Sequence, residues 1–293
     1  MPAEMDSPSG PSTEGALDGL LAVLDLVPLA ADRFRAACEG GRLFDRIYGG
    51  QLLAQAIVGA GRTAPDRDVS SVHATFVEAG DPARDVVVAV QRVRDGRSLV
   101  TREVTVMQGD RTLLVALVSL HSTGTDPDVG LPMPAVPSPG DLPAVQHWAA
   151  EHGRHWIEHP PPVELRIGEP LTFLGGAAGE GPRSHWMRVP RDVGDDPVLH
   201  AALLAYGSDF FLMDVVFRMH PHGAGVGRFG GFSLDHAIWF HRRPRFDEWH
   251  VHTQEGLAVV GDRGLAQGRI HDRGGRHVAT VMQEIVVRRL AAS

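Results

Sequence analysis

The sequence contains neither lysine nor asparagine, so all 28 of its basic residues are arginine. The absence of lysine excludes a phosphate-binding loop of the P-loop type and a Schiff-base mechanism. The single cysteine, Cys38, excludes an internal disulfide and a zinc site with four thiolate ligands, and it fits a reducing compartment. No recognisable base motif lies near Cys38, so we expect an unreactive thiol.

An excess of positive charge is also missing. The chain has 28 basic against 36 acidic residues and a formal net charge of −8. It therefore has no basic field for nucleic acid or for an anionic membrane surface, and we expect neither partner. The apolar stretch over residues 17–31 is interrupted by two aspartates and a proline, and Arg33 is the first basic residue. We expect no membrane insertion, no secretory signal and a cytoplasmic location.

The chain length and a composition shift indicate two domains. The 293 residues suffice for two domains of about 100–150 residues, and 43% hydrophobic residues can form packed cores. A stretch rich in proline and glycine divides the chain and ends in a short helical pattern. We predict a flexible N-terminal segment over 1–20, a first repeat over 21–122, a linker with a short helix over 123–162, and a second repeat over 163–293.

Each half contains the same order of patterns, one helix followed by four strands. Apolar residues recur at helical spacing over 49–62 and 197–217. Strand-like runs, in which apolar and polar residues tend to alternate, predict strands over 70–79, 85–94, 98–107 and 112–122, and then over 231–242, 249–258, 265–271 and 278–288. A helix covering the apolar face of an antiparallel sheet gives an α+β fold.

Four motifs resemble those of a known family. YGGQ (48–51) opens the first helix, YGSD (206–209) lies inside the second, SLDHAIWFHR (233–242) follows, and VMQE (281–284) lies near the end. Together they resemble the acyl-CoA thioesterase II (TesB-type) family over roughly residues 21–289. The resemblance implies a double hot-dog fold: two tandem repeats, each a long helix wrapped by a curled antiparallel β-sheet.

The same resemblance implies hydrolysis of fatty acyl-CoA to free fatty acid and CoA, with no acyl-enzyme and no cofactor apart from the CoA of the substrate. The family's catalytic aspartate, hydroxyl residue and glutamine fall on Asp209, Ser233 and Gln283. Relatives commonly carry threonine at the hydroxyl position, and serine keeps the donor and acceptor but loses the methyl group that limits rotation. The resemblance further implies a homo-oligomer, a dimer or tetramer of double hot-dog units.

The residues themselves leave alternatives open. Asp209 lies in an apolar helical stretch, where a carboxylate is costly to bury unless it has partners or a function. The alternative is a solvent-facing stripe or a helix break. Gln283 is the single amide of an apolar strand, on its inward face or at a strand edge. Ser233 begins a strand after two glycines, where a small hydroxyl commonly caps a turn.

Other chemistries find less support in the sequence. No G-x-S-x-G nucleophile elbow is complete at 96–100 or 231–235. The densest histidine group forms no H-E-x-x-H motif, so we expect no metal site; it contains His147, His152, His155 and His159 with Glu151 and Glu158.

Two alternative functions stay open. One is a hot-dog enoyl-CoA hydratase that uses Asp235 and His236, although neighbouring strand residues point to opposite faces. The other is a non-enzymatic protein that binds acyl-CoA or lipid. For the hydrolase we expect Asp209 to be the base, and we expect His121 to take the place of Gln283 in the first half, so that the two halves are unequal.

Overall fold

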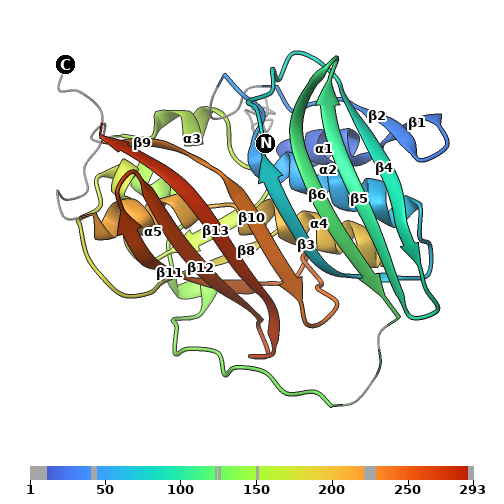
Figure 1. Ribbon diagram of the computed structural model, residues 1–293. Coiled ribbons are helices and arrows are strands. Elements are labelled where there is room, and N and C mark those ends of the chain that lie inside the picture. Colours follow the sequence, from blue (N-terminus) through green and yellow to red (C-terminus); the bar gives the residue numbers. More distant parts are fainter. Residues whose placement is uncertain are drawn as a thin grey trace, which may run out of the picture.

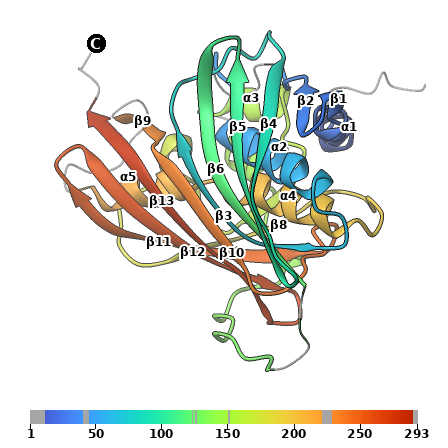
Figure 2. The ribbon, with the colours of Figure 1, turned by 45° about the vertical axis from the view of Figure 1, so that its right-hand side comes forward.

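A computed structural model describes residues 12–40, 45–122, 124, 127–149, 152–220 and 229–289. These residues form one continuous antiparallel sheet of 13 strands. The sheet curls around two central helices, α2 (Gly49–Arg62) and α4 (Pro197–Ser208), which lie behind it in Figure 1 and beside each other in Figure 2.

The first half supplies six strands of the sheet. Helix α1 (Thr13–Leu24) precedes β1 (Val27–Ala30) and β2 (Arg33–Ala36), and α2 is followed by β3 (Asp68–Phe76), β4 (Val86–Asp95), β5 (Leu99–Gln108) and β6 (Arg111–His121). Their order in the sheet is β1-β2-β4-β5-β6-β3. Along β5 the residues at 100, 102, 104 and 106 are buried and those at 101, 103 and 105 are half-buried, which is the alternation that predicted this strand.

The second half begins after short helices in the connecting segment, η1 (Pro139–Asp141), η2 (Val145–Ala149) and α3 (Arg154–Glu158). Its elements are β7 (Glu164–Ile167), η3 (Thr172–Leu174), β8 (Arg183–Arg188), α4, α5 (Leu212–Met219), β9 (Phe229–Ser233), β10 (Asp235–Phe240), β11 (His250–Val260), β12 (Arg263–Asp272) and β13 (His277–Arg289). The strand order is β10-β13-β12-β11-β8-β7, and β9 pairs with β13. Strands β3 and β10 pair and so join the halves, with Ala237 opposite His73.

This arrangement confirms the predicted α+β double hot-dog fold. Strands stand at all eight predicted places, although the run over 231–242 is two strands, β9 and β10. The sequence analysis missed β1, β2, β7 and β8, which lie toward the two ends of the sheet.

The predicted flexible segment over 1–20 is wrong from residue 13 onward. Helix α1 begins there, with Ser12 Oγ accepting a hydrogen bond from the Gly15 N–H (3.1 Å) as its cap. Leu17 and Leu20 are fully buried, because α1 packs against α2. Residues 1–11 lie outside the described residues.

The central helices are antiparallel and are buried over nearly their whole length. The N–H of Gly50 in α2 meets the end of α4, and Gly61 near the other end of α2 packs against Val198. The stretch Pro197–Met219 is apolar and long enough for a membrane span by composition alone, but 78% of its apolar window is buried inside the protein. This stretch is therefore read as the core of the second half.

The second helix was predicted to continue to residue 217, and this prediction is wrong. Helix α4 ends at Ser208, and α5 begins at Leu212. Between them Phe211 has a φ of 70°, an uncommon conformation for a bulky residue. Phe210 and Phe211 pack with Trp156, with ring centroids 6.1 and 5.8 Å away. We attribute the break to these tertiary contacts, which outweigh the local helical preference.

The expectation for His121 is also wrong. In the first half, β6 lies between β5 and the joining strand β3; in the second half, β13 lies between β12 and the joining strand β10. Strand β6 therefore corresponds to β13. The buried residues of β6 from 114 to 120 are Leu114, Ala116, Val118 and Leu120, all apolar, whereas His121 is half-buried at the strand's end. The halves are unequal, but no histidine replaces the glutamine.

Candidate active site

The structure brings Asp209, Ser233 and Gln283 together from three elements. Gln283 Nε2 donates hydrogen bonds to Asp209 Oδ1 (3.0 Å) and to Ser233 Oγ. The Asp209 side chain is 6% exposed and Gln283 is 1% exposed. A buried carboxylate, an amide and a hydroxyl therefore converge on one point.

Asp209 stands where the ends of the two central helices meet. It directly follows the last residue of α4, and its Oδ2 accepts a hydrogen bond from the Gly50 N–H in the first turn of α2 (2.9 Å). The positive end of the α2 dipole thus faces the carboxylate and stabilises negative charge there. The close approach requires glycine, because a Cβ on Gly50 would lie 2.6 Å from the Tyr206 carbonyl oxygen.

The strands position the other two groups. Gln283 is on the buried face of β13 together with Val281, Ile285 and Val287, as the alternation of the sequence indicated. Ser233 lies opposite Ile285 in the β9–β13 pair. It is the last residue of β9 rather than the first residue of a strand, so the expectation of a strand start is corrected.

Burial raises the pKa of Asp209 to about 6, although hydrogen bonds from Gln283, Gly50 and Tyr48 act in the opposite direction. A carboxylate with this pKa is ionised at pH 7 yet more basic than an exposed aspartate, as general-base catalysis requires. Burial and the nearby Asp209 raise the pKa of Tyr48 well above its ordinary value, so the phenol stays protonated.

Three further groups at the site were not assigned a role in the hydrolysis from the sequence. Gly50 and Tyr48 belong to the YGGQ motif, which was noted only as a family signature. His236 is fully buried in β10, with its Nε2 3.0 Å from Ser208 Oγ and its Nδ1 3.9 Å from Asp209 Oδ1. Because these contacts join residues that are far apart in the chain, no local sequence pattern could have predicted them.

Other acidic residues are occupied elsewhere. Asp235 Oδ1 accepts a hydrogen bond from the Glu284 N–H (2.7 Å), so its carboxylate supports the strand pairing and does not face His236 as a catalytic partner. Asp214 is buried in an ion pair with Arg183 and accepts a hydrogen bond from the Thr172 N–H (2.8 Å). Neither carboxylate takes part in the contacts of the trio.

The described residues contain no group of three or more histidine, cysteine, aspartate or glutamate side chains placed to hold a metal ion. The rings of His155 and His159 lie 6.5 Å apart, and Glu151 of the same predicted group lies outside the described residues.

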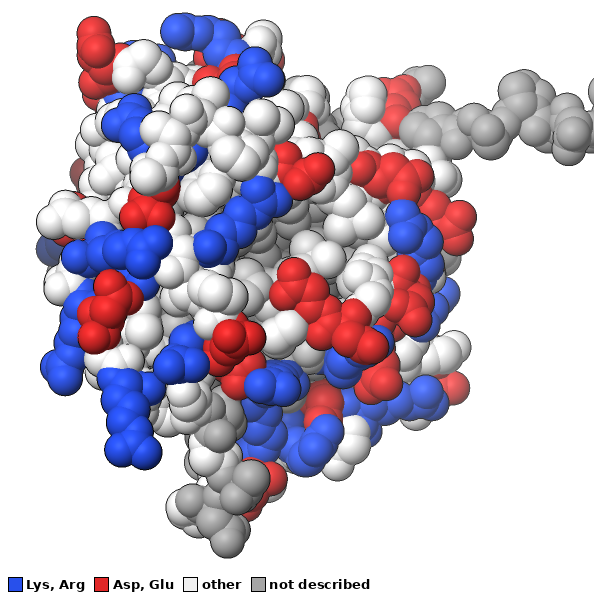
Figure 3. All heavy atoms as spheres, turned by 90° about the vertical axis from the view of Figure 1, so that its right-hand side faces the viewer, with Lys and Arg blue, Asp and Glu red and all other residues white. Residues whose placement is uncertain are grey.

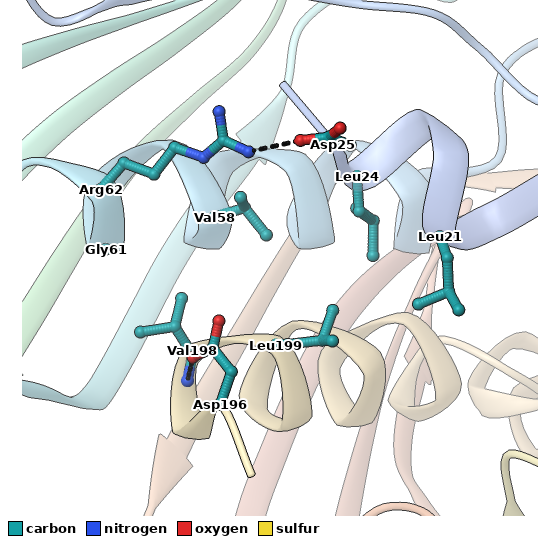
Figure 4. Close-up of a pocket in the computed structure, with 9 residues that line it drawn as sticks. All are labelled: Leu21, Leu24, Asp25, Val58, Gly61, Arg62, Asp196, Val198 and Leu199. Carbon is teal, nitrogen blue, oxygen red and sulfur yellow. Dashed lines mark hydrogen bonds and ion pairs between the residues drawn. The ribbon is translucent and has the colours of Figure 1, made fainter. Parts of the chain in front are cut away.

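The opposite ends of the central helices enclose a different kind of space. A hollow of about 420 Å³ lies between α1, α2 and α4, and Figure 4 shows its mostly apolar lining with the ion pair of Arg62 and Asp25 at its edge. The residues that line it are Leu21, Leu24, Asp25, Val58, Gly61, Arg62, Asp196, Val198 and Leu199. At this end of the two helices, Gly61 of α2 packs against Val198 of α4. The contact between Gly50 and Asp209 is at the other end.

Comparisons with known proteins agree with the fold of both halves. Residues 42–121 match the model of the acyl-CoA thioesterase N-terminal domain, and residues 153–286 match the acyl-CoA thioesterase model. Acyl-coenzyme A thioesterase 8 of Mus musculus is 30% identical and aligns over 98% of this chain and 96% of its own. The chain belongs to the TesB-type acyl-CoA thioesterase II family.

Two further relatives support the assignment to this family. Acyl-CoA thioesterase 2 of Haemophilus influenzae is 30% identical over 84% of this chain and 88% of its own. The structure of the acyl-CoA thioesterase II TesB2 from Mycobacterium marinum is 33% identical, covers 93% of this chain and 99% of its own, and superposes with a TM-score of 0.76. The family assignment therefore extends over both repeats.

Proposed function

We propose that this protein hydrolyses fatty acyl-CoA to free fatty acid and CoA, with Asp209 as the general base. The acyl-CoA substrate is that of the family, and the contacts among the three residues support the roles that we propose for them. The single observation that carries the assignment is the contact of the buried Asp209 carboxylate with Gln283, which in turn reaches Ser233.

The proposed reaction begins with a water molecule held by Ser233 and Gln283 beside Asp209. Asp209 takes a proton from this water as its oxygen attacks the thioester carbonyl, and the tetrahedral intermediate then expels the CoA thiolate. The thiolate is a good leaving group, so a positioned water and one base suffice. The thiolate gains a proton on release, and no covalent bond to the protein forms.

The charge of the surface is consistent with a small-molecule substrate. Figure 3 shows one face of the molecule, on which acidic and basic side chains are intermixed and no large area carries one sign. Because every basic residue is arginine, we propose that arginines bind the CoA phosphates, for which their planar donor groups are suited.

The test is release of free thiol from acyl-CoA thioesters of increasing chain length, followed with a thiol-reactive dye. We expect CoA release that depends on protein concentration, with equimolar free fatty acid. Hydration of an enoyl-CoA without thiol release would contradict the proposal in favour of a hydratase. Binding of acyl-CoA without turnover would contradict it in favour of a binding protein.

We also propose that copies of this chain associate through the outward face of the sheet where the halves join. Val115 and Leu117 of β6 and Trp239 of β10 are exposed there by 37%, 47% and 36%. Strand β3 lies between β6 and β10, and the ring of its His73 contacts Trp239 edge-on at 5.0 Å. A second copy is the occupant that buries such a face symmetrically.

A further inference from the structure

His236 of β10 lies against the catalytic trio but is not one of its members. The side chain is fully buried. Its Nε2 is 3.0 Å from Ser208 Oγ, and its Nδ1 is 3.9 Å from Asp209 Oδ1 without a hydrogen-bond partner among the described residues. A polar atom buried beside a reacting carboxylate calls for a physical account.

The two ring nitrogens face different chemistry. On the Nε2 side, the single proton of the Ser208 hydroxyl can go to the ring or to the Ala205 carbonyl oxygen (2.8 Å), and a ring protonated on Nδ1 requires that it goes to the ring. On the Nδ1 side the nearby charged group is the Asp209 carboxylate, which can only accept. A proton on Nδ1 therefore meets an acceptor, whereas a lone pair there would meet another lone pair.

The orientation of the Gln283 amide depends on the same nitrogen. Gln283 Nε2 is occupied by Asp209 and Ser233, and Oε1 is buried without a hydrogen-bond partner among the described residues. Rotation of the amide by half a turn would place Oε1 against the Asp209 carboxylate and remove the donor that the trio requires. The Gln283 side chain acts on the pKa of His236 through hydrogen bonding, so a proton on Nδ1 directed at Oε1 would oppose this rotation.

We propose that His236 is a positioning residue for the hydrolysis, a neutral imidazole protonated on Nδ1 that holds the Gln283 amide with its nitrogen toward Asp209 and Ser233. The inference rests on the proposed function, because it acts through the proposed catalytic groups.

The electrostatics of the surroundings keep the ring neutral. Burial lowers the pKa of His236 to about 4, and the Gln283 side chain acts in the opposite direction, as an acceptor oxygen does. Three titratable groups lie near the His236 ring. Burial favours the protonated form of Asp209, and Tyr48 lies beside Asp209. The third is His252 of β11, whose pKa lies well below its ordinary value. His236 is thus no general base at pH 7.

The first test measures the tautomer directly. In ¹⁵N-labelled protein between pH 6 and 8, we expect His236 to show the shifts of a neutral ring protonated on Nδ1, assigned by their loss in His236→Asn. His200 is an internal reference of the opposite kind, since its Nδ1 accepts the Phe246 N–H (3.0 Å) and its Nε2 is 2.8 Å from the Gly194 carbonyl oxygen. A His236 ring protonated on Nε2 or on both nitrogens would overturn the inference.

The second test compares two substitutions that each keep one of the two polar positions. The amide of asparagine lies near the position of Nδ1, and the amide of glutamine lies near that of Nε2. We expect His236→Asn to keep kcat within about fivefold of the parent and His236→Gln to lower kcat by roughly ten- to a hundredfold, with little change in KM. Equal losses in both variants, or a larger loss in His236→Asn, would refute the role.

Two controls separate positioning from stability. The first control is His200→Asn, which changes a different buried histidine, one that lies in α4. We expect it to lower the melting temperature and to leave kcat per folded protein unchanged. Adding His236→Gln to Gln283→Ala should cost no further activity, because residues that act as a unit are not additive. Additive losses would contradict the inference, whereas a parent protein without CoA release would contradict the proposed function and leave the tautomer measurement decisive.

Discussion

At the scale of single residues, the site depends on one carboxylate whose proton affinity is set by burial. The partners that keep Asp209 ionised come from α2 and β13, 159 and 74 residues away in the sequence. Sequence patterns alone left Asp209 undecided between a site and a helix break. The structure places it directly after the last residue of α4, in contact with Gln283. The family motif indicated the residue, but only the tertiary contacts give the physical reason.

The raised pKa of Asp209 predicts the pH dependence of activity. Since the base must be ionised, kcat/KM should fall as the pH drops through about 6 and reach a plateau above it. The measurement is CoA release from pH 4.5 to 8 at subsaturating substrate. A rate that stays constant down to pH 4.5 would show that a group with a lower pKa, or none, limits the reaction.

The same pKa predicts that the ionised Asp209 costs stability. A carboxyl group whose pKa is raised on folding stabilises the native state when protonated, and this contribution is lost as the pH rises from about 4 to about 6. Asp209→Asn should therefore gain stability relative to the parent between pH 5 and pH 7.5, by roughly half of the ~3 kcal/mol that a shift of about two units is worth over the whole pH range. Thermal unfolding of both proteins at the two pH values measures this, and a pH-independent difference would contradict the shift.

At the scale of elements, the strand patterns of the sequence were reliable because the sheet has one buried and one outward face. Alternation along β5 and β13 follows this burial directly. The break between α4 and α5 was missed, since its causes are contacts of Phe210 and Phe211 with a distant tryptophan. Helix α1 was missed because its apolar stretch is short and its cap lies in a segment of low-complexity composition.

The approach of α2 to α4 predicts the effect of a single methyl group. In Gly50→Ala the new Cβ would lie 2.5 Å from a ring carbon of Tyr48 as well as against the Tyr206 carbonyl, so the helix ends must separate. We expect a loss of roughly 1–3 kcal/mol in unfolding free energy and a fall in kcat. Gly15→Ala in α1 is the control, with an ordinary contact of 3.4 Å and no expected loss. Unchanged activity in Gly50→Ala would show that the contact is not needed.

The buried ion pair of the second half predicts a purely structural effect. Asp214→Asn removes the buried charged partner of the Arg183 guanidinium, whose side chain is 2% exposed, and leaves it only the half-exposed Glu169 (2.9 Å). We expect a loss of about 3–5 kcal/mol in unfolding free energy. Asp32→Asn, at the more exposed pair with Arg92, should change it by less than about 1 kcal/mol. Denaturant unfolding compares the two, and equal effects would contradict the account.

At the scale of the whole molecule, the repeat organisation could be predicted because both halves carry the same order of helix and strands. The joining of the halves through β3 and β10 and the strands toward the two ends of the sheet could not, since pairing between distant strands leaves no mark in a single sequence. The outward face at this junction carries the exposed apolar side chains Val115, Leu117 and Trp239, which are the basis for the proposed association of copies.

That association predicts the effect of a charge on the outward face. Leu117→Arg adds a charge at a position that is 47% exposed in the single chain, so it should leave the fold intact and shift the protein from an oligomer to a single chain. Light scattering after size exclusion gives the mass of both proteins. An unchanged mass would place the interface elsewhere, and a parent that is a single chain at all concentrations would refute the proposal. Val129→Arg, at a residue 88% exposed, is the control.

The central claim is that Asp209 activates the water that cleaves the thioester, and its most direct test is CoA release by Asp209→Asn. Asparagine keeps the size of the side chain but cannot take the proton, so turnover should fall by roughly two to four orders of magnitude with less effect on KM. The turnover of Ser233→Ala should fall by less than that of Asp209→Asn, and Ser233→Thr should stay active. Folded Asp209→Asn protein that releases CoA at nearly the parental rate would contradict the account.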